Sequence, residues 1–208
     1  MNYFATFAAV SLRTFHIFQE ARQQYEQAQS FLKVAHCFLS SSLGEERELV
    51  QTVMYEARRL TNADRCAIFL LDENEKVLEA HFDTKTVVRM PMTSGIAGHV
   101  VSTGCSIRLA DAYTHPNFNR SVDVVTGYRT KSLLCVPVMY ENNIVAVAQL
   151  VNKLDADGCV IPFTEDDERS LSTFSPFAGC SLRNARLFQF AEFKATKADA
   201  MLRLAHTL

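Results

Sequence analysis

The sequence contains no tryptophan and is poor in glycine and proline, with 7 and 5 residues among 208. This scarcity excludes collagen-like and low-complexity chains, and a 48% hydrophobic share with a net charge of −2 excludes intrinsic disorder. The 21 basic residues are balanced by 23 acidic ones. This balance argues against a dedicated nucleic-acid binder, because affinity for phosphate backbones comes from clustered Lys and Arg. We therefore expect one folded domain with additional helix.

Membrane, disulfide and zinc signals are missing as well. No apolar run reaches the roughly 18 residues of a membrane span, and the apolar start lacks the positively charged segment of a signal peptide. The six cysteines are evenly spread, form no CxxC pair and lie mostly in apolar surroundings: Cys37, Cys66, Cys105, Cys135, Cys159 and Cys180. We interpret them as reduced, buried thiols of a cytoplasmic protein, without a metal site.

The first forty residues indicate one long helix, because no Gly or Pro precedes Gly44. Within it, apolar residues recur in alternating steps of three and four: Phe18, Ala21, Tyr25, Ala28, Leu32, Ala35 and Leu39. This spacing is typical of a coiled-coil seam and predicts pairing with a second copy, with packing on the chain's own domain as the alternative. The three alanines weaken the seam, so the pairing is expected to need contacts elsewhere.

The remaining pattern predicts strands grouped between helices. A helix follows the capping box of Ser42 and Glu45. The later segments read as strands at 66–71, 77–82 and 87–90, a helix at 96–103, a polar loop or lid helix at 111–131, strands at 132–140 and 144–152, and a helix from 164 to about 193. Pro137 inside a strand indicates an edge or a bulge. The predicted class is α+β with an antiparallel sheet.

The loop after the last strands holds the most specific motif. Asn152-Lys153 is followed after a gap by Phe163, and three residues later by Asp167-Glu168. From about residue 62 to about 193 the chain resembles the GAF domains of cyclic-nucleotide phosphodiesterases. Further matching pieces, in the same order, are Asn62-Ala63-Asp64-Arg65-Cys66, Gly95-Ile96-Ala97-Gly98-His99, Asp111-Ala112-Tyr113, His115-Pro116 and Thr126-Gly127-Tyr128.

The resemblance implies a GAF-like fold, with a six-stranded antiparallel sheet and helices on both sides. It divides the chain into a connecting and dimerisation helix at 1–44, the domain at 45–193, and a helical extension at 194–208 that leads toward a further domain.

The motif residues are expected to form a structural clip rather than to touch a ligand. Lys153 ends a strand and Asp167 lies in the first turn of the last helix, where a negative charge is favoured. An ion pair between them would fasten the loop to the helix, and partial shielding would strengthen it; an ordinary solvated pair is the alternative. We assign Asn152, Lys153, Phe163, Asp167 and Glu168 to this clip.

Two features point to a ligand when they are considered with the resemblance. Free N–H groups at the helix start Gly95-Ile96-Ala97-Gly98 suit an anion, although the pattern is weak alone; in the family this segment contacts the cyclic phosphate. Gln149 interrupts an apolar strand, on one face with Val145, Val147 and Val151. Its amide can bond a neighbouring backbone or match adenine, since it both donates and accepts. Some relatives that favour guanine have Glu here, so we expect cAMP, with cGMP as the alternative.

Other ligand contacts follow from the resemblance alone. Phe82 would stack on the purine, with an ordinary core position as the alternative. The remaining candidates are Asp83 beside the base, Cys66 and Ala67 at the pocket floor, Ile96 and Ala97 at the phosphate, Thr126 and Thr130 near the ribose and phosphate, and Asn119 and Asp123 in the lid.

No catalytic constellation is present in the sequence. The six histidines show no metal-ligand spacing, and backbone amides with threonines can hold a cyclic phosphate but not cleave it. We predict a regulatory domain that binds cyclic nucleotide without a cofactor, forms homodimers through its terminal helices and belongs to a larger hydrolase. The alternatives are an interaction module with an empty pocket and, less favoured by the cysteine positions, a sulfoxide reductase using Cys105.

Overall fold

The computed structural model describes residues 2–40, 46–82 and 86–206, apart from the side chains of residues 2–6, 37–40, 122, 125–126, 199–200 and 202–206. The predicted capping box of Ser42 and Glu45 lies outside the described residues. The helices are α1 (Asn2–Ser40), α2 (Glu46–Thr61), α3 (Gly95–Thr103), α4 (Ser121–Thr126) and α5 (Glu165–His206), and a 3₁₀ turn lies at Ala112–Thr114. The strands are β1 (Ala63–Asp72), β2 (Val77–Phe82), β3 (Val87–Pro91), β4 (Ile107–Leu109), β5 (Leu133–Tyr140), β6 (Asn143–Leu154) and β7 (Val160–Ile161).

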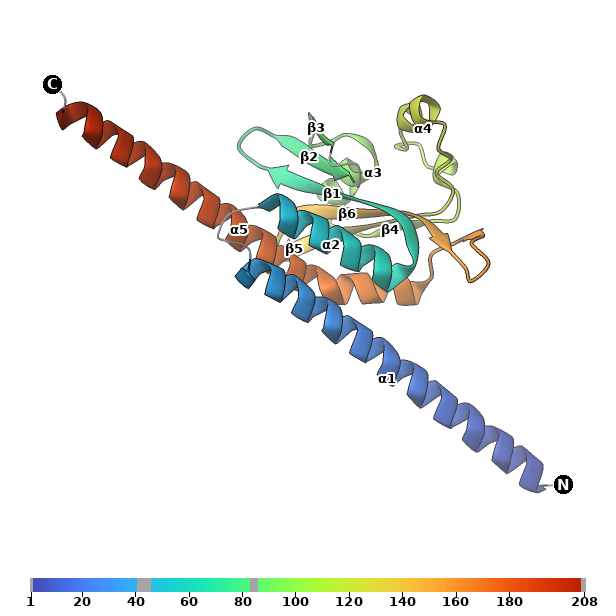
Figure 1. The fold of residues 1–208 in the computed structure, drawn as a ribbon. Coiled ribbons are helices and arrows are strands. Elements are labelled where there is room, and N and C mark those ends of the chain that lie inside the picture. Colours follow the sequence, from blue (N-terminus) through green and yellow to red (C-terminus); the bar gives the residue numbers. More distant parts are fainter. Residues whose placement is uncertain (1, 41–45, 83–85, 207–208) are drawn as a thin grey trace.

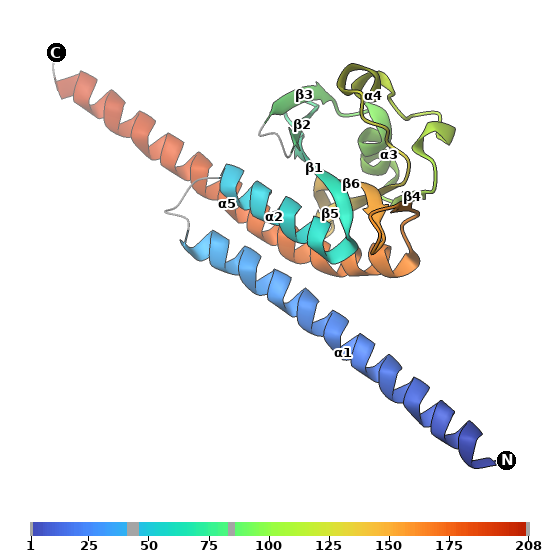
Figure 2. The same ribbon diagram turned by 45° about the vertical axis from the view of Figure 1, so that its right-hand side comes forward.

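The strands form one antiparallel sheet in the order β3-β2-β1-β6-β5-β4, with β7 paired to β6. Helices α2 and α5 cover one face, which we call the helical face (Figure 1). Helix α3 and the segment 111–131 lie on the other, which we call the α3 face (Figure 2). The predicted α+β class is confirmed. Besides the six strands in the main order, the sheet contains the two-residue strand β7.

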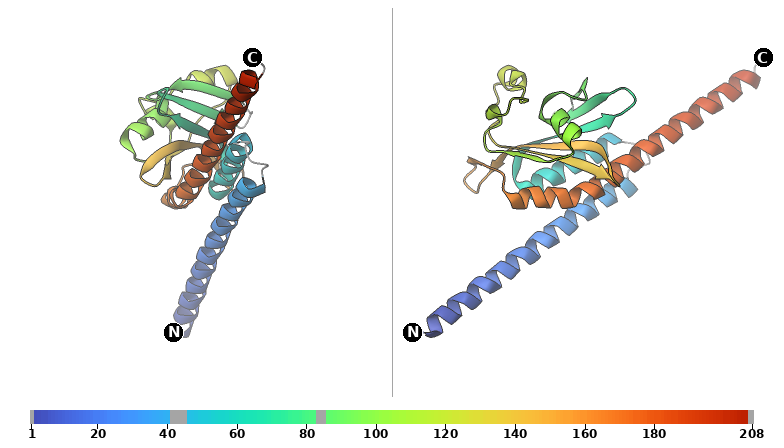
Figure 3. Two further views of the ribbon diagram at one scale, coloured as in Figure 1. Left: turned by 90° about the vertical axis from the view of Figure 1, so that its left-hand side faces the viewer. Right: turned by 180° about the vertical axis from the view of Figure 1, so that it is seen from behind.

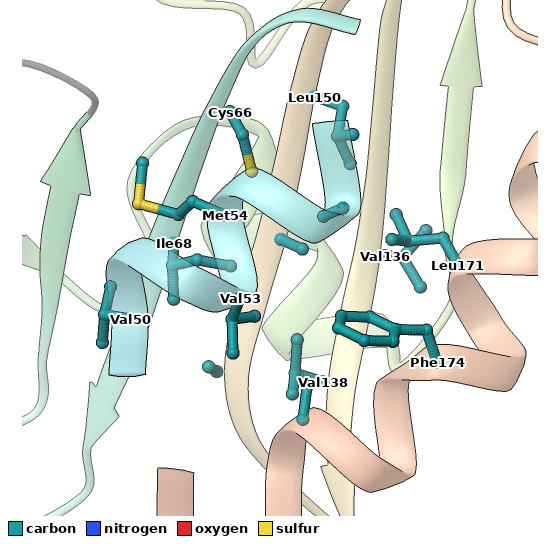
Figure 4. Close-up of a cluster of buried hydrophobic side chains, with 14 of the residues drawn as sticks. Val50, Val53, Met54, Cys66, Ile68, Val136, Val138, Leu150, Leu171 and Phe174 are labelled. Atoms are coloured by element: carbon teal, nitrogen blue, oxygen red, sulfur yellow. The ribbon is translucent and has the colours of Figure 1, made fainter. Parts of the chain in front are cut away.

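The helical face holds the larger core. Alternate residues of β1, β5 and β6 point toward α2 and α5 and pack with them, as Figure 4 shows for Ile68, Val136 and Leu150. Phe174 of α5 and Met54 of α2 are each 1% exposed in this layer. The period-two pattern of the strands and the apolar stripe of α2 therefore meet in one contiguous core, which holds both helices against the sheet.

Strand β5 is irregular at the point that the sequence predicted. Strand β4 pairs only with Leu133–Cys135 of β5, so Pro137 lies at an open edge where no ladder bond needs its missing N–H. The register shifts between Val138 and Met139, and Ser175 of α5 bridges the irregularity. Its hydroxyl donates to the Pro137 carbonyl at 2.7 Å and accepts from the Met139 N–H at 3.0 Å. Helix α5 is thereby fixed directly to the β5 backbone.

Helix α1 packs on its own domain through its second half. Phe31 stacks on Phe174 with ring centroids 5.8 Å apart and also contacts Phe177, while Ser30 and Val34 are fully buried. The predicted seam lies elsewhere on the helix: Phe18, Tyr25 and Leu32 are 67%, 64% and 70% exposed. The side chain of Leu39 is outside the described set. Helix α1 therefore does pack on its own domain, as in the alternative, but it does so through a different face. The predicted seam stays exposed.

Helices α1 and α5 extend the molecule in opposite directions. The N-terminal half of α1 leaves the domain at one end and the C-terminal half of α5 leaves it at the other (Figures 1 and 3). Helix α5 continues without a break past residue 193, where we expected the domain to end. The division at residues 44 and 193 stays a prediction. Among the described residues, no helix is both long enough and apolar enough to cross a membrane.

The cysteine interpretation is wrong in part. Cys66 and Cys135 are buried, but Cys105, Cys159 and Cys180 are exposed, and all five are free thiols. The side chain of Cys37 is not described. The prediction relied on apolar neighbours in the sequence, and these do not ensure burial. Cys105 and Cys159 lie in loops, and Cys180 lies on the outer side of α5. The cytoplasmic location stays a prediction.

Candidate functional site

A single row of residues crosses the α3 face of the sheet. Phe82 on β2 is the register partner of Ala67 on β1, Ala67 that of Gln149 on β6, Gln149 that of Cys135 on β5, and Cys135 that of Ile107 on β4. Paired residues in neighbouring strands point to the same face, so these five side chains share one surface. The structure therefore brings together three of the predicted ligand residues, Phe82, Ala67 and Gln149.

Gln149 stands in this row without a protein partner. Its side chain is half-buried, and its amide makes no hydrogen bond to any described residue. Neither neighbour in the row satisfies it, because Ala67 is apolar and Cys135 is a buried thiol whose pKa is raised by burial. The amide atoms of Gln149 are not fully buried, so water can satisfy them in the free protein and a ligand edge can take the place of that water. Gln149 is therefore the side chain best suited to read a ligand edge.

The predicted neighbours of Gln149 need one correction. Val147 packs in the core of the α3 face as expected, but Val145 packs on the helical face. The register shift opposite Met139 places both Val145 and Ala146 on the helical face, which interrupts the alternation. Strand alternation is therefore reliable only between Ala146 and Val151.

The side chain of Cys66 does not share a face with the other predicted ligand residues of the sheet. Its side chain is 3% exposed and points into the helical-face core beside Met54, away from the row (Figure 4). Ala67 is its neighbour in β1 and faces the row, since adjacent strand residues face opposite sides. The two cannot both form a pocket floor with their side chains. Phe82 remains part-exposed at the end of β2, with its ring edge-on to Phe69 at 6.4 Å. Asp83 lies outside the described residues.

The start of α3 presents free backbone donors on this face. Ser94 caps the helix without a side-chain bond, and the first helical N–H to find an acceptor is that of Gly98, bonded to the Ser94 carbonyl. The N–H groups of Gly95, Ile96 and Ala97 have no acceptor among the described residues. The Ile96 and Ala97 side chains pack in the same core as Ala67 and Cys135, which fixes the helix start beside the row.

The two glycines of this segment serve different needs. Gly95 has φ of +67°, a conformation that glycine adopts without strain. At Gly98 a Cβ atom would lie 2.3 Å from the Thr93 carbonyl carbon, so only glycine allows the turn before α3 to pack against it. Close approach of the chain to itself, rather than of a ligand to the chain, explains Gly98.

The lid residues are largely bonded to one another. Asp123 is 7% exposed and accepts from the Thr130 N–H, the Thr130 hydroxyl and the Tyr113 hydroxyl at 2.7, 2.8 and 3.1 Å. Asn119 is exposed and accepts from the Ser121 N–H. Thr126 ends α4, and its side chain is not described. The structure thus uses Asp123 and Thr130, which we predicted as ligand contacts, to hold the segment 111–131 together.

Arginine–tyrosine stacks at the lid were not predicted from the sequence. Arg120 and Arg129 lie over the Tyr113 ring at 4.8 and 3.6 Å from its centroid, and Arg65 lies 3.7 Å from that of Tyr128. These stacks, with the buried Asp123 network, give the lid a defined shape although it has little apolar core. The tyrosines themselves were visible in the matching pieces, but their cationic partners come from distant positions.

The lid is tied to α3 and to the clip. Inside the lid, Asn117 bonds the Nδ1 atom of His99 of α3 through its side chain and that of His115 through its backbone N–H. At the root of the lid, Asn152 accepts from the Lys131 N–H and donates to the Arg129 carbonyl and the Tyr128 hydroxyl, all within 2.9 Å. Asn152 adopts φ of +56°, and this turn aims its amide at the lid.

The other clip residues join β6 to α5. Lys153 Nζ contacts both carboxylate oxygens of Asp167, and the contact to Oδ2 measures 2.5 Å. Asp167 also accepts from the N–H and the hydroxyl of Thr164, the residue before α5. Glu168 bonds Ser106 and Arg108 beside β4, and Phe163 is 2% exposed in the helical-face core. The motif thus fastens the lid, the sheet and α5 to one another at one corner.

A hollow of about 460 Å³ lies away from this site. Its lining residues come from the end of α2 and the adjoining ends of β1 and β6: Tyr55, Arg58, Arg59, Asn62, Ala63, Leu154 and Asp155. It mixes charges of both signs at the C-terminus of a helix, so it does not resemble an anion site. Among the described residues, no three His, Cys, Asp or Glu side chains are grouped to hold a metal ion.

Comparisons with known proteins place these features in a family. A family model described as the GAF domain matches residues 45–182. The chain is 34% identical over 164 residues to the dual 3′,5′-cyclic-AMP and -GMP phosphodiesterase 11A of Takifugu rubripes, covering 72% of this chain and 18% of that protein. It is 31% identical over 187 residues to the probable 3′,5′-cyclic phosphodiesterase pde-5 of Caenorhabditis elegans, covering 83% and 25%. The chain spans a quarter or less of these two proteins.

Solved structures share the fold. The GAF domain of an Acinetobacter phosphoenolpyruvate-protein phosphotransferase superposes with a TM-score of 0.61, covering 77% of this chain and 95% of that one, at 20% identity. At this level of identity the likeness concerns the fold alone.

Proposed function

The chain belongs to the GAF domain family, and we propose that it is a regulatory domain of a cyclic-nucleotide phosphodiesterase that binds cAMP without hydrolysing it. The nucleotide would lie on the α3 face between the row and the lid. The supporting observation is the unpartnered amide of Gln149, set between Ala67 and Cys135 in a row that ends at Phe82.

Each part of the ligand has a counterpart on this face. The purine would stack on the part-exposed ring of Phe82, and its edge would meet Gln149, whose amide can donate to a ring nitrogen and accept from the adenine amino group. The cyclic phosphate would accept from the free N–H groups of Ile96 and Ala97 at the positive end of α3. These groups bind and orient the nucleotide, and none of them supplies the acid, base or metal that hydrolysis needs.

The regulatory step would run from this face to α5. The row includes Cys135, and two residues farther along β5 the Pro137 carbonyl is bonded to Ser175 of α5. A ligand regulates a protein only if it binds two conformations of that protein with different affinity. The lid and the contact between Ser175 and Pro137 are the parts that would differ between the two conformations. Hydrolysis is proposed for the larger protein, in line with the names of the relatives, and not for residues 1–208.

Titration calorimetry of the 208-residue chain with cAMP, cGMP and 5′-AMP tests the proposal. We expect binding of cAMP, weaker binding of cGMP and loss of cAMP binding in Gln149→Ala. Gln149→Glu should shift the preference toward cGMP, because a carboxylate accepts from the N1–H and amino group of guanine. Gln24→Ala on exposed α1 is the control. Absence of binding to both cyclic nucleotides would overturn the proposal.

The second candidate is an interaction module without ligand. The exposed Phe18, Tyr25 and Leu32 favour it, because they mark an uncovered seam that needs no nucleotide. The two functions are compatible, and we propose a homodimer through the terminal helices in either case. Sedimentation equilibrium together with the cAMP and cGMP titration separates them: a dimer that binds neither nucleotide is the interaction module alone.

A further inference from the structure

The exposed seam of α1 alternates in side-chain size. One of its two heptad positions carries only large residues and the other only alanine: Phe18, Tyr25 and Leu32 against Ala21, Ala28 and Ala35. In the three-and-four spacing, these sets form the a and d positions respectively. The seam therefore has a size pattern as well as a hydrophobic one, and that pattern restricts how two copies can meet.

The domain does not obstruct this seam. The residues with which α1 contacts its own domain include Gln23 and Ser30 at f, Val34 at c and Phe31 at g, so the domain covers the side of the helix opposite a and d and reaches the edge of the seam at Phe31. Of the seam, Ala21 and Ala28 are exposed and Ala35 is half-buried, and the three large residues are at least 64% exposed. A second helix can approach along a and d while each domain stays on the outer side of the pair.

Parallel pairing suits this pattern poorly. In a parallel pair each residue meets its own copy, so layers of two large side chains would alternate with layers of two alanines. The alanine layers would leave voids whenever the large layers are in contact, and voids in a packed interface are costly. Antiparallel pairing instead places each a residue opposite a d residue, which gives one large and one small side chain in every layer.

We propose that α1 pairs antiparallel with α1 of a second copy, with the twofold axis passing between Glu26 and Gln27. In this register Phe18 faces the partner's Ala35, Tyr25 faces the partner's Ala28, and Leu32 faces the partner's Ala21. All six layers have similar volume, and the alanines let the helix axes come close. The inference rests on the proposed homodimer and adds its orientation and register.

Disulfide trapping tests the register. The background replaces Cys37, Cys105, Cys159 and Cys180 by serine, and Phe18→Cys and Ala35→Cys are made separately. In the antiparallel pair the two copies of residue 18 lie about 25 Å apart along the axis, too far for a disulfide. We expect oxidation to link the two variants when they are mixed and neither variant to itself, as read by mass spectrometry of the linked peptides. A Phe18→Cys homodisulfide would indicate a parallel pair and overturn the inference.

A size substitution provides an independent readout. Ala28→Leu places a large residue against the partner's Tyr25 in the antiparallel pair, and we expect the dimer dissociation constant to rise about tenfold. In a parallel pair the same change fills a void and tightens the dimer. Gln19→Leu, which adds the same side chain outside the seam, is the control. A tighter Ala28→Leu dimer contradicts the inference, whereas a monomeric chain removes the proposed homodimer itself and leaves the cAMP titration unaffected.

Discussion

Lys153 shows how much a single ion pair can contribute when it is shielded. Its side chain is 16% exposed and that of Asp167 is 8% exposed, so replacing Lys153 leaves a carboxylate out of water with only Thr164 as a partner. We expect Lys153→Met to lower the free energy of unfolding in urea by about 3 kcal/mol. The control is Arg169→Met, which breaks the Arg169–Asp166 pair, 76% and 70% exposed, and should cost less than about 0.5 kcal/mol. Equal losses would mean that the clip is an ordinary surface pair.

The sequence shows which side-chain types stand out at the site. It does not show to which face of the sheet each side chain points. Gln149 is conspicuous in any apolar strand, and Lys153 and Asp167 form a recognisable pattern. Cys66 and Ala67 are adjacent, and alternation says only that they face opposite sides, not which side holds the ligand. The hydrogen bonds between Asp123 and Thr130 were not predicted, because they depend on the turn after α4, which the local sequence does not specify.

Among the elements, α5 meets β5 at unusually short range. A Cβ atom on Gly179 would lie 2.0 Å from the Met139 carbonyl oxygen, a backbone atom with little freedom to move. In an exposed helix Gly→Ala gains about 1 kcal/mol, but here the clash outweighs that gain. We expect Gly179→Ala to lower the thermal unfolding midpoint, with a net loss of about 2 kcal/mol. Ser172→Ala at an exposed site of the same helix should be neutral, and a stabilised Gly179→Ala protein would contradict the close contact.

A buried carboxylate joins α1 to α2. Glu56 is 1% exposed and accepts from Arg59, Ser30 and Lys33 within 3.2 Å. Burial alone would raise the pKa of Glu56, but these hydrogen bonds outweigh it and hold the pKa below its ordinary 4.5. Because the folded-state pKa is lowered, the stabilisation is complete above pH 4.5 and is lost as pH falls through the folded-state pKa.

We expect the stability advantage of the wild type over Glu56→Gln to shrink steadily as pH is lowered from about 6 to about 3. The measurement is the free energy of unfolding in urea at each pH, and Glu20→Gln, on the exposed part of α1, should show a much weaker dependence. An advantage that stays constant over this range would show that the carboxylate charge does not hold the two helices together.

Elements with a strong period were predicted closely, and short or irregular ones were not. Val77–Phe82 matches its predicted bounds, and the strand predicted at 66–71 lies within Ala63–Asp72. Strands β4 and β7 were missed because three and two residues are too few to show a period. Val145 was predicted on the wrong face because a bulge interrupts the alternation. The only sequence signal of this bulge is Pro137 in the neighbouring strand. The helix predicted from 164 to about 193 and the helical extension predicted at 194–208 form one continuous helix, Glu165–His206, because no Gly or Pro interrupts the chain near residue 193.

The whole molecule separates a compact binding face from two projecting helices. The row, α3 and the lid lie on one side of the sheet, and α1 and α5 lie on the other and leave the domain at opposite ends (Figures 2 and 3). The side chains of residues 7–25 are exposed, and near the end of this stretch Gln23 Nε2 donates to Ser170 Oγ of α5 at 2.9 Å. A ligand on the α3 face can reach the projecting helices through the sheet and the two helices packed on it, which are α5 itself and α2, whose Glu56 is bonded to Ser30 of α1.

Hydrogen exchange with and without cAMP follows this route through the molecule. We expect slower exchange at the start of α3, in residues 111–131 and in β6 near Gln149, where the ligand would cover or order the backbone, and a change at Met139, whose N–H is bonded to Ser175 of α5. Residues 7–20 should exchange at the same rate in both states. The Gln149→Ala variant with cAMP is the control and should resemble the ligand-free protein. Protection of the α3 face without any change at Met139 or in α5 would mean that the domain binds its ligand without passing a signal to the helix that leaves it.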